Sequence, residues 1–286
     1  MKKVIGLMIG LVPLSVSAEC VPSPDCASIG YTETSCDGDS LKCPFDSSKL
    51  KCFPCDSSFR YSCTGENITG GIGNTCNGKY VDCECKERTI FTNGKCVCDT
   101  SCDVVGNIVY SDRSCSSCNL TDKIPVAIVA HKDENKRLII PLNTPYKRWS
   151  SYNADVTILE NLETAEIAKL DMDGANNSQR IRELFASDNE TNNAAWYCYN
   201  LELEGFEEYK NQWYLPAAWE LYNYYYGNIT SIKKAFSTLG ITTYNTCFWS
   251  SSENNIHRAW SVWSDDGGLR LDGKNGSYKT TCFLAI

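Results

Sequence analysis

Histidine is scarce in this chain, and its scarcity limits the catalytic chemistry that the chain can perform. Only two of the 286 residues are histidine, His131 and His257, and they are far apart in the sequence. The serine run at 250–252 lacks the G-x-S-x-G pattern of a nucleophile elbow. Since an enzyme needs a nucleophile, a base or a metal, we expect no catalytic residue and no cofactor.

The chain also lacks excess positive charge and a second long apolar run. Its 27 lysines and arginines face 35 aspartates and glutamates, for a net charge of -8. Nucleic acids and anionic membrane surfaces require basic patches, so neither is an expected partner. No stretch after the first 20 residues approaches the roughly 20 apolar residues that a membrane span needs.

The N-terminus has the layout of a removable signal peptide, which we place at residues 1–18. Lys2 and Lys3 form a positive region, an apolar run follows, and small residues precede a cleavage position after Ala18. An N-terminal core helix is one alternative. Lipidation of Cys20 is another, although Glu19 stands where a lipobox has a small residue. The expected location is secreted or at the cell surface, with the periplasm and attachment to the cell envelope as open alternatives.

Cysteine is abundant, and its distribution predicts a disulfide-stapled segment over residues 19–121. Fifteen of the 18 cysteines lie between Cys20 and Cys118, a density that indicates disulfides in an exported chain. Zinc is the rival interpretation, because C-x-x-C spacing occurs at 52–55 and 115–118, but the segment has no histidine. We expect small β-turn modules that act as a spacer, with ligand binding as the alternative.

Residues 122–286 change to apolar periodicity and predict one α+β domain. A hairpin is expected from strands at 125–130 and 138–140. Helices are expected at 192–203, 213–225 and 229–239, the last stopped by Gly240. Antiparallel strands follow, in which Trp260 and Val262 face one side and Ser261 and Trp263 the other. One final strand is expected from Tyr278 to Ile286.

The order of short motifs in this half resembles a known family. The motifs are DMDGANNSQRI (171–181), AAWYC (194–198), WYLPAAWEL (213–221), WSSSE (249–253), AWSV (259–262), DDGG (265–268) and TTCFLAI (280–286). Together they resemble the C-terminal domain of bacterial collagen-like adhesins, whose fold is a relative of the C-type lectins. The resemblance covers roughly residues 124–286 and implies a C-type-lectin-like domain with antiparallel strands and two to three helices.

The resemblance also implies a disulfide and argues against two other functions. Cys198 and Cys282 match the positions that C-type-lectin relatives bridge, which leaves Cys247 either free or paired with the N-terminal segment. Calcium-dependent sugar binding needs E-P-N or Q-P-D and W-N-D sequences, and these are absent. We therefore expect no metal. The formylglycine-generating enzymes share the fold but use a close pair of late cysteines, which this chain lacks.

The resemblance finally implies a binding surface after WSSSE, for an extracellular glycan or protein ligand. The candidate residues are Asn254, Asn255, His257, Arg258, Trp263, Arg270, Asp272, Lys274, Asn275 and Tyr278. Mixed polar groups with Trp, Tyr and Arg are typical of recognition patches. An exported adhesin-type protein is therefore the expected function. A structural or envelope-assembly protein with no small ligand is the alternative, and a formylglycine-type enzyme a remote one.

Overall fold

The computed structural model describes residues 21–22, 52–53, 60–62, 67–74, 82–92, 95–150, 155–156, 159–186 and 192–286. The chain divides into two compact units, Met1–Val97 and Cys98–Ile286. The predicted signal peptide and most of the early cysteines lie outside the described residues.

The described parts of the N-terminal unit are short strands joined by disulfide chemistry. The strands are β1 (Val21–Pro22), β2 (Cys52–Phe53), β3 (Arg60–Ser62), β4 (Ile68–Asn74), β5 (Asp82–Cys85), β6 (Thr89–Thr92) and β7 (Lys95–Cys98). They form a β1–β2 pair, a β3–β4–β5 sheet and a β6–β7 hairpin. A disulfide between Cys85 and Cys96 ties β5 to β7. The described residues of this unit therefore contain short β-strands, and one disulfide staples two of them.

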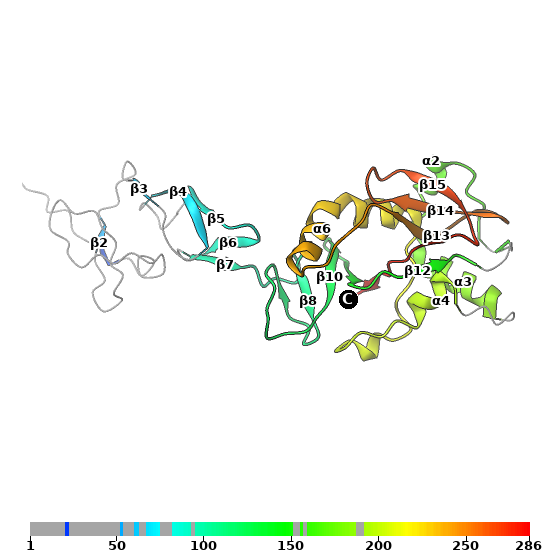
Figure 1. Cartoon of the computed structure of the whole chain (residues 1–286), viewed down its shortest axis with the longest axis horizontal. Coiled ribbons are helices and arrows are strands. Elements are labelled where there is room, and N and C mark those ends of the chain that lie inside the picture. The colour runs from blue at the N-terminus through cyan, green and yellow to red at the C-terminus, as the bar shows by residue number, and fades with distance from the viewer. Residues whose placement is uncertain are drawn as a thin grey trace, which may run out of the picture. The chain divides into compact units, whose positions relative to one another are not determined.

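The C-terminal unit contains two five-stranded sheets and several short helices (Figure 1). Its strands are β8 (Ile108–Tyr110), β9 (Cys115–Ser116), β10 (Pro125–Lys132), β11 (Arg137–Pro141), β12 (Tyr146–Arg148), β13 (Cys247–Asn255), β14 (Arg258–Trp263), β15 (Leu269–Gly273), β16 (Ser277–Lys279) and β17 (Leu284–Ala285). Its α-helices are α2 (Ala165–Ala168), α3 (Gly174–Ala186), α4 (Ala194–Tyr199), α5 (Ala218–Glu220) and α6 (Ile229–Thr238). The predicted α+β class is confirmed.

The first sheet begins earlier in the chain than the predicted domain start at residue 122. Its strand order is β17–β11–β10–β8–β9, and β8 is fully buried. Ile108 pairs with Ile128 of β10, inside the hairpin that the sequence predicts. The difference arises because the sequence between residues 98 and 121 is cysteine-rich like the segment before it, while its three apolar residues at 108–110 complete a core sheet.

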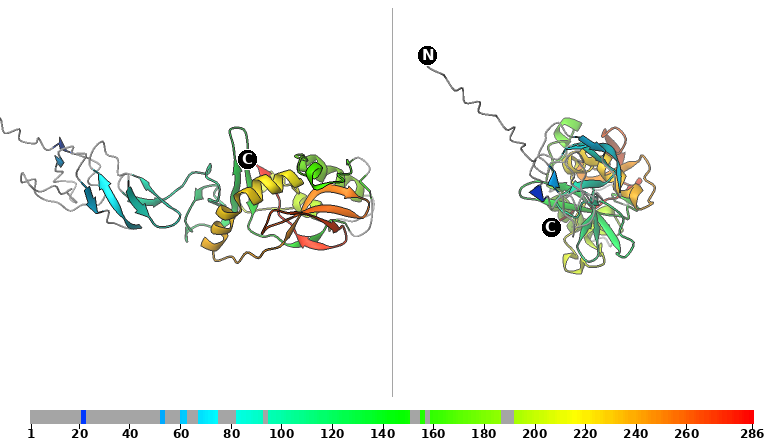
Figure 2. Two further views of the ribbon diagram at one scale, coloured as in Figure 1. Left: turned by 90° about the horizontal axis from the view of Figure 1, so that it is seen from above. Right: turned by 90° about the vertical axis from the view of Figure 1, so that its left-hand side faces the viewer.

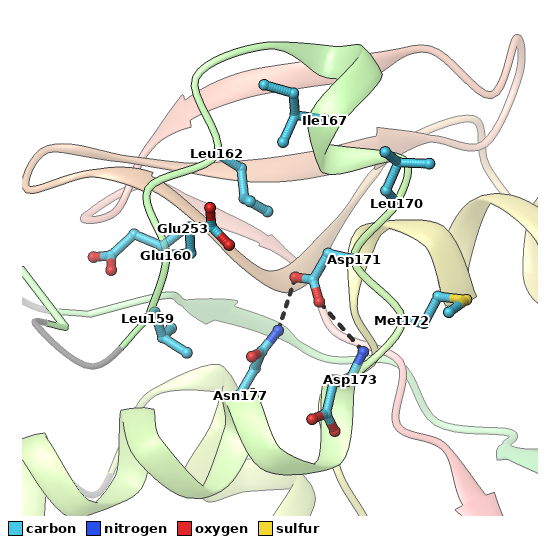
Figure 3. Close-up of a pocket in the computed structure, with 10 residues that line it drawn as sticks. All are labelled: Leu159, Glu160, Leu162, Ile167, Leu170, Asp171, Met172, Asp173, Asn177 and Glu253. Carbon is cyan, nitrogen blue, oxygen red and sulfur yellow. Dashed lines mark hydrogen bonds between the residues drawn. The ribbon is translucent and has the colours of Figure 1, made fainter.

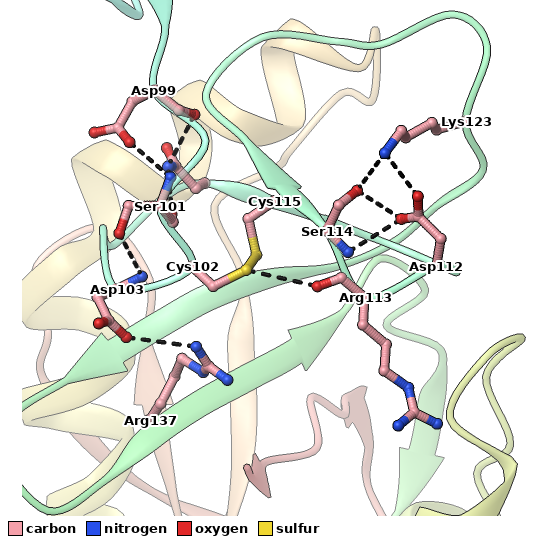
Figure 4. The surroundings of a disulfide bond; sticks show 11 residues. Asp99, Ser101, Cys102, Asp103, Asp112, Arg113, Ser114, Cys115, Lys123 and Arg137 are labelled. Atoms are coloured by element: carbon pink, nitrogen blue, oxygen red, sulfur yellow. Dashed lines mark hydrogen bonds and ion pairs between the residues drawn. A yellow bond between two sulfur atoms is a disulfide. The ribbon is translucent and has the colours of Figure 1, made fainter.

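Two disulfides fasten this early part of the unit. Cys98 bonds Cys118, and Cys102 bonds Cys115 of β9. Figure 4 shows the second bridge with its surroundings, where Lys123 contacts both Asp112 and Ser114. Both cysteines of the C-x-x-C pair at 115–118 are therefore used in disulfides, as the favoured prediction required, and not as zinc ligands.

The second sheet has the order β12–β16–β13–β14–β15. Ser261 pairs with Arg270 and Trp260 pairs with Leu271 across β14 and β15. Since paired residues of antiparallel strands share a face, the predicted alternation is confirmed. Trp260 and Val262 are buried toward the helices, and Ser261 and Trp263 lie on the other face.

The last ten residues do not form the single strand that the sequence predicts. Tyr278 lies in β16 of the second sheet, whereas Leu284 lies in β17 of the first. Between them the chain crosses from one sheet to the other, since Thr280 donates to the carbonyl of Pro145 and Phe283 forms a bridge with Tyr214. A period of two continues through this crossing, and that is why the pattern alone does not reveal it.

The helices differ from their predicted lengths. Asn193 caps α4 by accepting from the amide of Trp196, and α4 is shorter than predicted. The segment at 213–225 is helical only from Ala218 and continues as a wider turn over Leu221–Tyr225. The last helix ends as predicted near Gly240, whose φ of +73° suits glycine.

Helix α6 and the two sheets pack together in one apolar cluster. Ile232 and Phe236 of α6 pack with Ile128 of the first sheet and with Phe248 and Val262 of the second. Figure 2 shows α6, in yellow and orange, beside both. The helix therefore helps to hold the two sheets in fixed relation.

The disulfide implied by the family resemblance is present. Cys198 of α4 bonds Cys282, which lies within the crossing segment, with Cα atoms 5.4 Å apart. Cys247 is buried and makes no disulfide with any residue that the structure describes. Within that part of the chain, no helix combines the length and apolar character needed to traverse a bilayer.

Candidate recognition surfaces

Four of the ten predicted site residues lie together on one face of the second sheet. Arg270 and Asp272 are two residues apart on β15 and so share a face. Trp263 is the last residue of β14, and the hydroxyl of Tyr278 on β16 donates to Asp272. We call these four residues the strand face. Trp263 and Tyr278 are half-buried and Arg270 is exposed, so the surface offers aromatic, cationic and anionic groups at once.

Hydrogen bonds fix the orientation of the strand face. Asp272 accepts from the Tyr278 hydroxyl at 2.9 Å and from the Ser261 hydroxyl at 2.5 Å. The Tyr278 ring packs edge-on against buried Trp249, with centroids 4.9 Å apart. Arg270 pairs with Asp266 at 2.9 Å. A ligand would therefore meet side chains that already hold one arrangement.

The hydroxyl of Tyr278 should report on this network. Partial burial raises its pKa to about 12, and the hydrogen bond to Asp272 adds to the increase. We expect Asp272→Asn to lower the pKa of Tyr278 toward its ordinary value of 10.0, because the neutral amide no longer repels the phenolate. An ultraviolet absorbance titration, with Tyr278→Phe to identify the signal, measures this change. An unaltered pKa would argue against the contact.

Four other predicted residues lie at the open end of the β14–β15 hairpin, opposite its connecting turn at 264–268. Asn255, His257, Arg258 and Asn275 occupy the two turns on either side of the Arg258–Gly273 pair. The Asn255 carboxamide accepts from the amides of His257 and Arg258 and so shapes its turn. His257, Arg258 and Asn275 are exposed, but they lie at the far end of β14 from Trp263.

The remaining two predicted residues are buried, so the expectation that they are displayed is wrong. Lys274 is 0% exposed and forms an ion pair with Glu253, because the β15–β16 turn directs it inward beneath Trp149. Asn254 is buried and donates to the carbonyl of Leu162 at 2.9 Å. Both side chains make internal contacts and are not displayed on the surface.

A pocket that the sequence did not reveal lies between the α2 segment, β13 and the start of α3. Its volume is about 540 Å3, within the range usual for ligand sites. Figure 3 shows Leu162, Ile167 and Leu170 along one side and Asp171, Asp173 and Asn177 along the other. The pattern DMDGANN is the signal that places Asp171, Asp173 and Asn177 together, although its connection to a pocket depends on the fold.

Close backbone contact explains the glycine of that pattern. A Cβ at Gly174 would lie 2.5 Å from the amide nitrogen of Ala217 and 2.3 Å from Glu220. Only glycine lets α3 begin against the start of α5. Asp171 accepts from Asn177 at 2.8 Å and from Ser252 at 2.6 Å, so one carboxylate joins α3 to β13.

Ser252 also replaces a missing helix cap. Ala217 occupies the N-cap position of α5 and has no side-chain group that can accept from the first turn. Glu220 accepts from the Ala217 amide at 3.0 Å, and Ser252 of β13 accepts from the Ala218 amide at 2.8 Å. Glu220 thus supplies one half of a capping box, and the neighbouring strand provides a further acceptor.

No cluster of three histidine, cysteine, aspartate or glutamate residues suited to a metal occurs in the described ranges. His131 stacks on Tyr224, with centroids 3.8 Å apart, and contacts Asp133. His257 lies at the exposed turn. Burial raises the pKa of the Cys247 thiol, which disfavours the nucleophilic thiolate.

The similarities to solved structures include a distant one to a fimbrial protein. A fimbrial protein from Bacteroides ovatus aligns over 88% of this chain with a TM-score of 0.46 and 14% sequence identity. The alignment spans 63% of the length of that fimbrial protein. No family model matches the sequence, and no curated protein matches it.

Proposed function

We propose that this is an exported, non-catalytic adhesin-type protein whose C-terminal unit is a C-type-lectin-like relative of the collagen-like-adhesin domain. In this proposal the strand face recognises an extracellular glycan or protein, and the N-terminal segment is a spacer. The observation that carries the proposal is the gathering of Trp263, Arg270, Asp272 and Tyr278 on one hydrogen-bonded sheet face.

The chemistry of the strand face supports recognition of a polyol or a polar peptide surface. Aromatic rings offer flat apolar area at low conformational cost. The carboxylate and guanidinium groups provide directional hydrogen bonds. The four disulfides found in the described residues fit an oxidising, extracytoplasmic environment.

The absence of catalytic function is also a proposal, and two observations support it. Cys282 is committed to the bridge with Cys198, and Cys247 is a buried thiol with a raised pKa. A formylglycine-type mechanism would need reactive thiols close together. Neither cysteine meets that requirement.

A glycan array and a surface-protein capture assay with the full chain test the binding proposal. We expect Trp263→Ala combined with Arg270→Ala to weaken binding at least about tenfold, since central aromatic and arginine residues dominate recognition energies. The matched control is His257→Ala combined with Asn275→Ala, which changes the exposed open end of the β14–β15 hairpin and should retain binding. If both double variants bind the ligand equally well, the strand face is not the binding site. Self-assembly without any captured ligand would favour the envelope-assembly alternative.

A further inference from the structure

The pocket beside α2 has an unusual combination of exposed apolar side chains and carboxylates. Leu170 is 72% exposed, Met172 61% and Ile167 45%. These three residues follow one another within a single short segment, and each is among the pocket-lining residues. Adjacent exposed apolar side chains of this size are uncommon on a soluble surface and indicate a contact site.

The charges that line the pocket have one sign. Glu160, Asp171 and Asp173 contribute carboxylates that are at least partly exposed, and the carboxylate of Glu253 lies fully buried behind them. No lysine, arginine or histidine is among the lining residues. Figure 3 shows the carboxylates of Asp171 and Glu253 turned toward the same space, with Glu160 and Asp173 at its margin. Lys274 forms a buried ion pair with Glu253. It therefore neutralises the charge of Glu253 and leaves the other three carboxylates without a lysine partner from within the pocket lining.

The pocket is held by contacts that do not involve the strand face. The amide of Leu162 donates to the carbonyl of Glu253, and its own carbonyl accepts from Trp260 at 2.8 Å. Thr164 caps α2 by accepting from Ile167. The wall of the pocket is therefore anchored to β13 and β14, which gives it a defined shape before any ligand binds.

We propose that this pocket is a second binding site, which takes a polypeptide segment with a lysine or arginine side chain flanked by apolar side chains. The cationic group would lie near Asp171 and Asp173, and its apolar neighbours would cover Ile167, Leu170 and Met172. Charge complementarity selects a basic ligand. The extent of apolar surface beyond the carboxylates selects a peptide over a simple amine, because an amine leaves that surface uncovered.

Fluorescence anisotropy with the full chain tests the proposal. The probe is a labelled hexapeptide of alternating leucine and lysine. Comparison peptides replace either the lysines with glutamate or the leucines with serine, and spermidine serves as a competitor. We expect the leucine–lysine peptide to bind, both comparison peptides to bind at least about tenfold more weakly, and spermidine to compete poorly.

Two variants and a matched control separate this site from general attraction to an acidic protein. Glu160→Gln combined with Asp173→Asn, and separately Leu170→Ser, should each weaken peptide binding about tenfold. Asp122→Asn combined with Glu134→Gln removes the same charge from exposed positions elsewhere and should leave binding unchanged. Equal weakening by the control, undiminished binding by both pocket variants, tight binding of spermidine or no binding of the peptide would each overturn the proposal.

Discussion

Replacing Lys274 with methionine is expected to destabilise the C-terminal unit by about 3–5 kcal/mol, because it leaves Glu253 buried without its cation. Both side chains are 0% exposed. Glu253 also accepts from the amide of Val156 with both of its oxygens, so it cannot turn toward water without losing those bonds. Urea denaturation measures the loss in the free energy of unfolding.

The same ion pair gives two controls. Adding Glu253→Gln to Lys274→Met removes both charges and should recover at least half of the loss, since replacing a whole buried pair is often neutral. Lys210→Met removes a lysine that pairs with Glu202 at the surface and should cost no more than about 1 kcal/mol. If Lys274→Met proves as mild as Lys210→Met, the buried pair does not exist in solution.

The pH dependence of the Lys274→Met variant has a defined sign. Burial raises the pKa of Glu253 above its ordinary value of 4.5, and loss of the neighbouring cation raises it further. A carboxyl with a raised pKa binds a proton more readily in the folded state than in the unfolded state. The stability penalty is therefore complete above the folded-state pKa of Glu253 and shrinks as the pH falls through that pKa toward 4.5.

Removing the Cys198–Cys282 bridge is the second change with a large expected effect. The bridge joins residues 84 positions apart, and an interval of that length corresponds to about 4.5 kcal/mol in the chain-entropy estimate. We expect the variant with alanine at both positions to lose about 4.5 kcal/mol in its free energy of unfolding. It should therefore unfold at a lower urea concentration and at a lower temperature than the wild-type chain. Both sulfurs are buried, so part of the loss comes from packing.

Cys247→Ala is the control for that packing contribution. It removes one buried sulfur without opening a bridge. Its loss in the free energy of unfolding should be several kcal/mol smaller than that of the double alanine variant. Treatment of the wild-type chain with a thiol reductant should reproduce most of the double variant's loss. A stability difference below about 1 kcal/mol between the bridged and unbridged chains would contradict the assigned role of the bridge.

The sequence predicts this fold best where local periodicity and structure agree. The β10–β11 hairpin, the last helix and the alternation along β14 each follow from a period that packing preserves. The final strand was mispredicted because its period continues while the chain passes between sheets. The sequence did not indicate that β8 belongs to the first sheet, because the cysteine content around it hides its burial.

The candidate site was predicted less completely, for a reason that Lys274 illustrates. A lysine two residues after Asp272 has the appearance of a surface residue, and its partner Glu253 lies 21 positions earlier. Only the fold brings the two together. The pocket was missed for a related reason, because the stretch 159–177 supplies all of its lining residues except Glu253, and only the fold places that stretch against β13.

The bridge between Cys198 and Cys282 closes a covalent ring that contains the whole strand face. The stretch at 242–245 within that ring is exposed, and Tyr244 is 72% exposed. A protease that cut the chain there would leave both pieces linked through sulfur, each still anchored in its own part of the sheets. For a protein outside the cell, the bridge thus confers tolerance to a single nick, so that cleavage of this stretch does not by itself release a fragment.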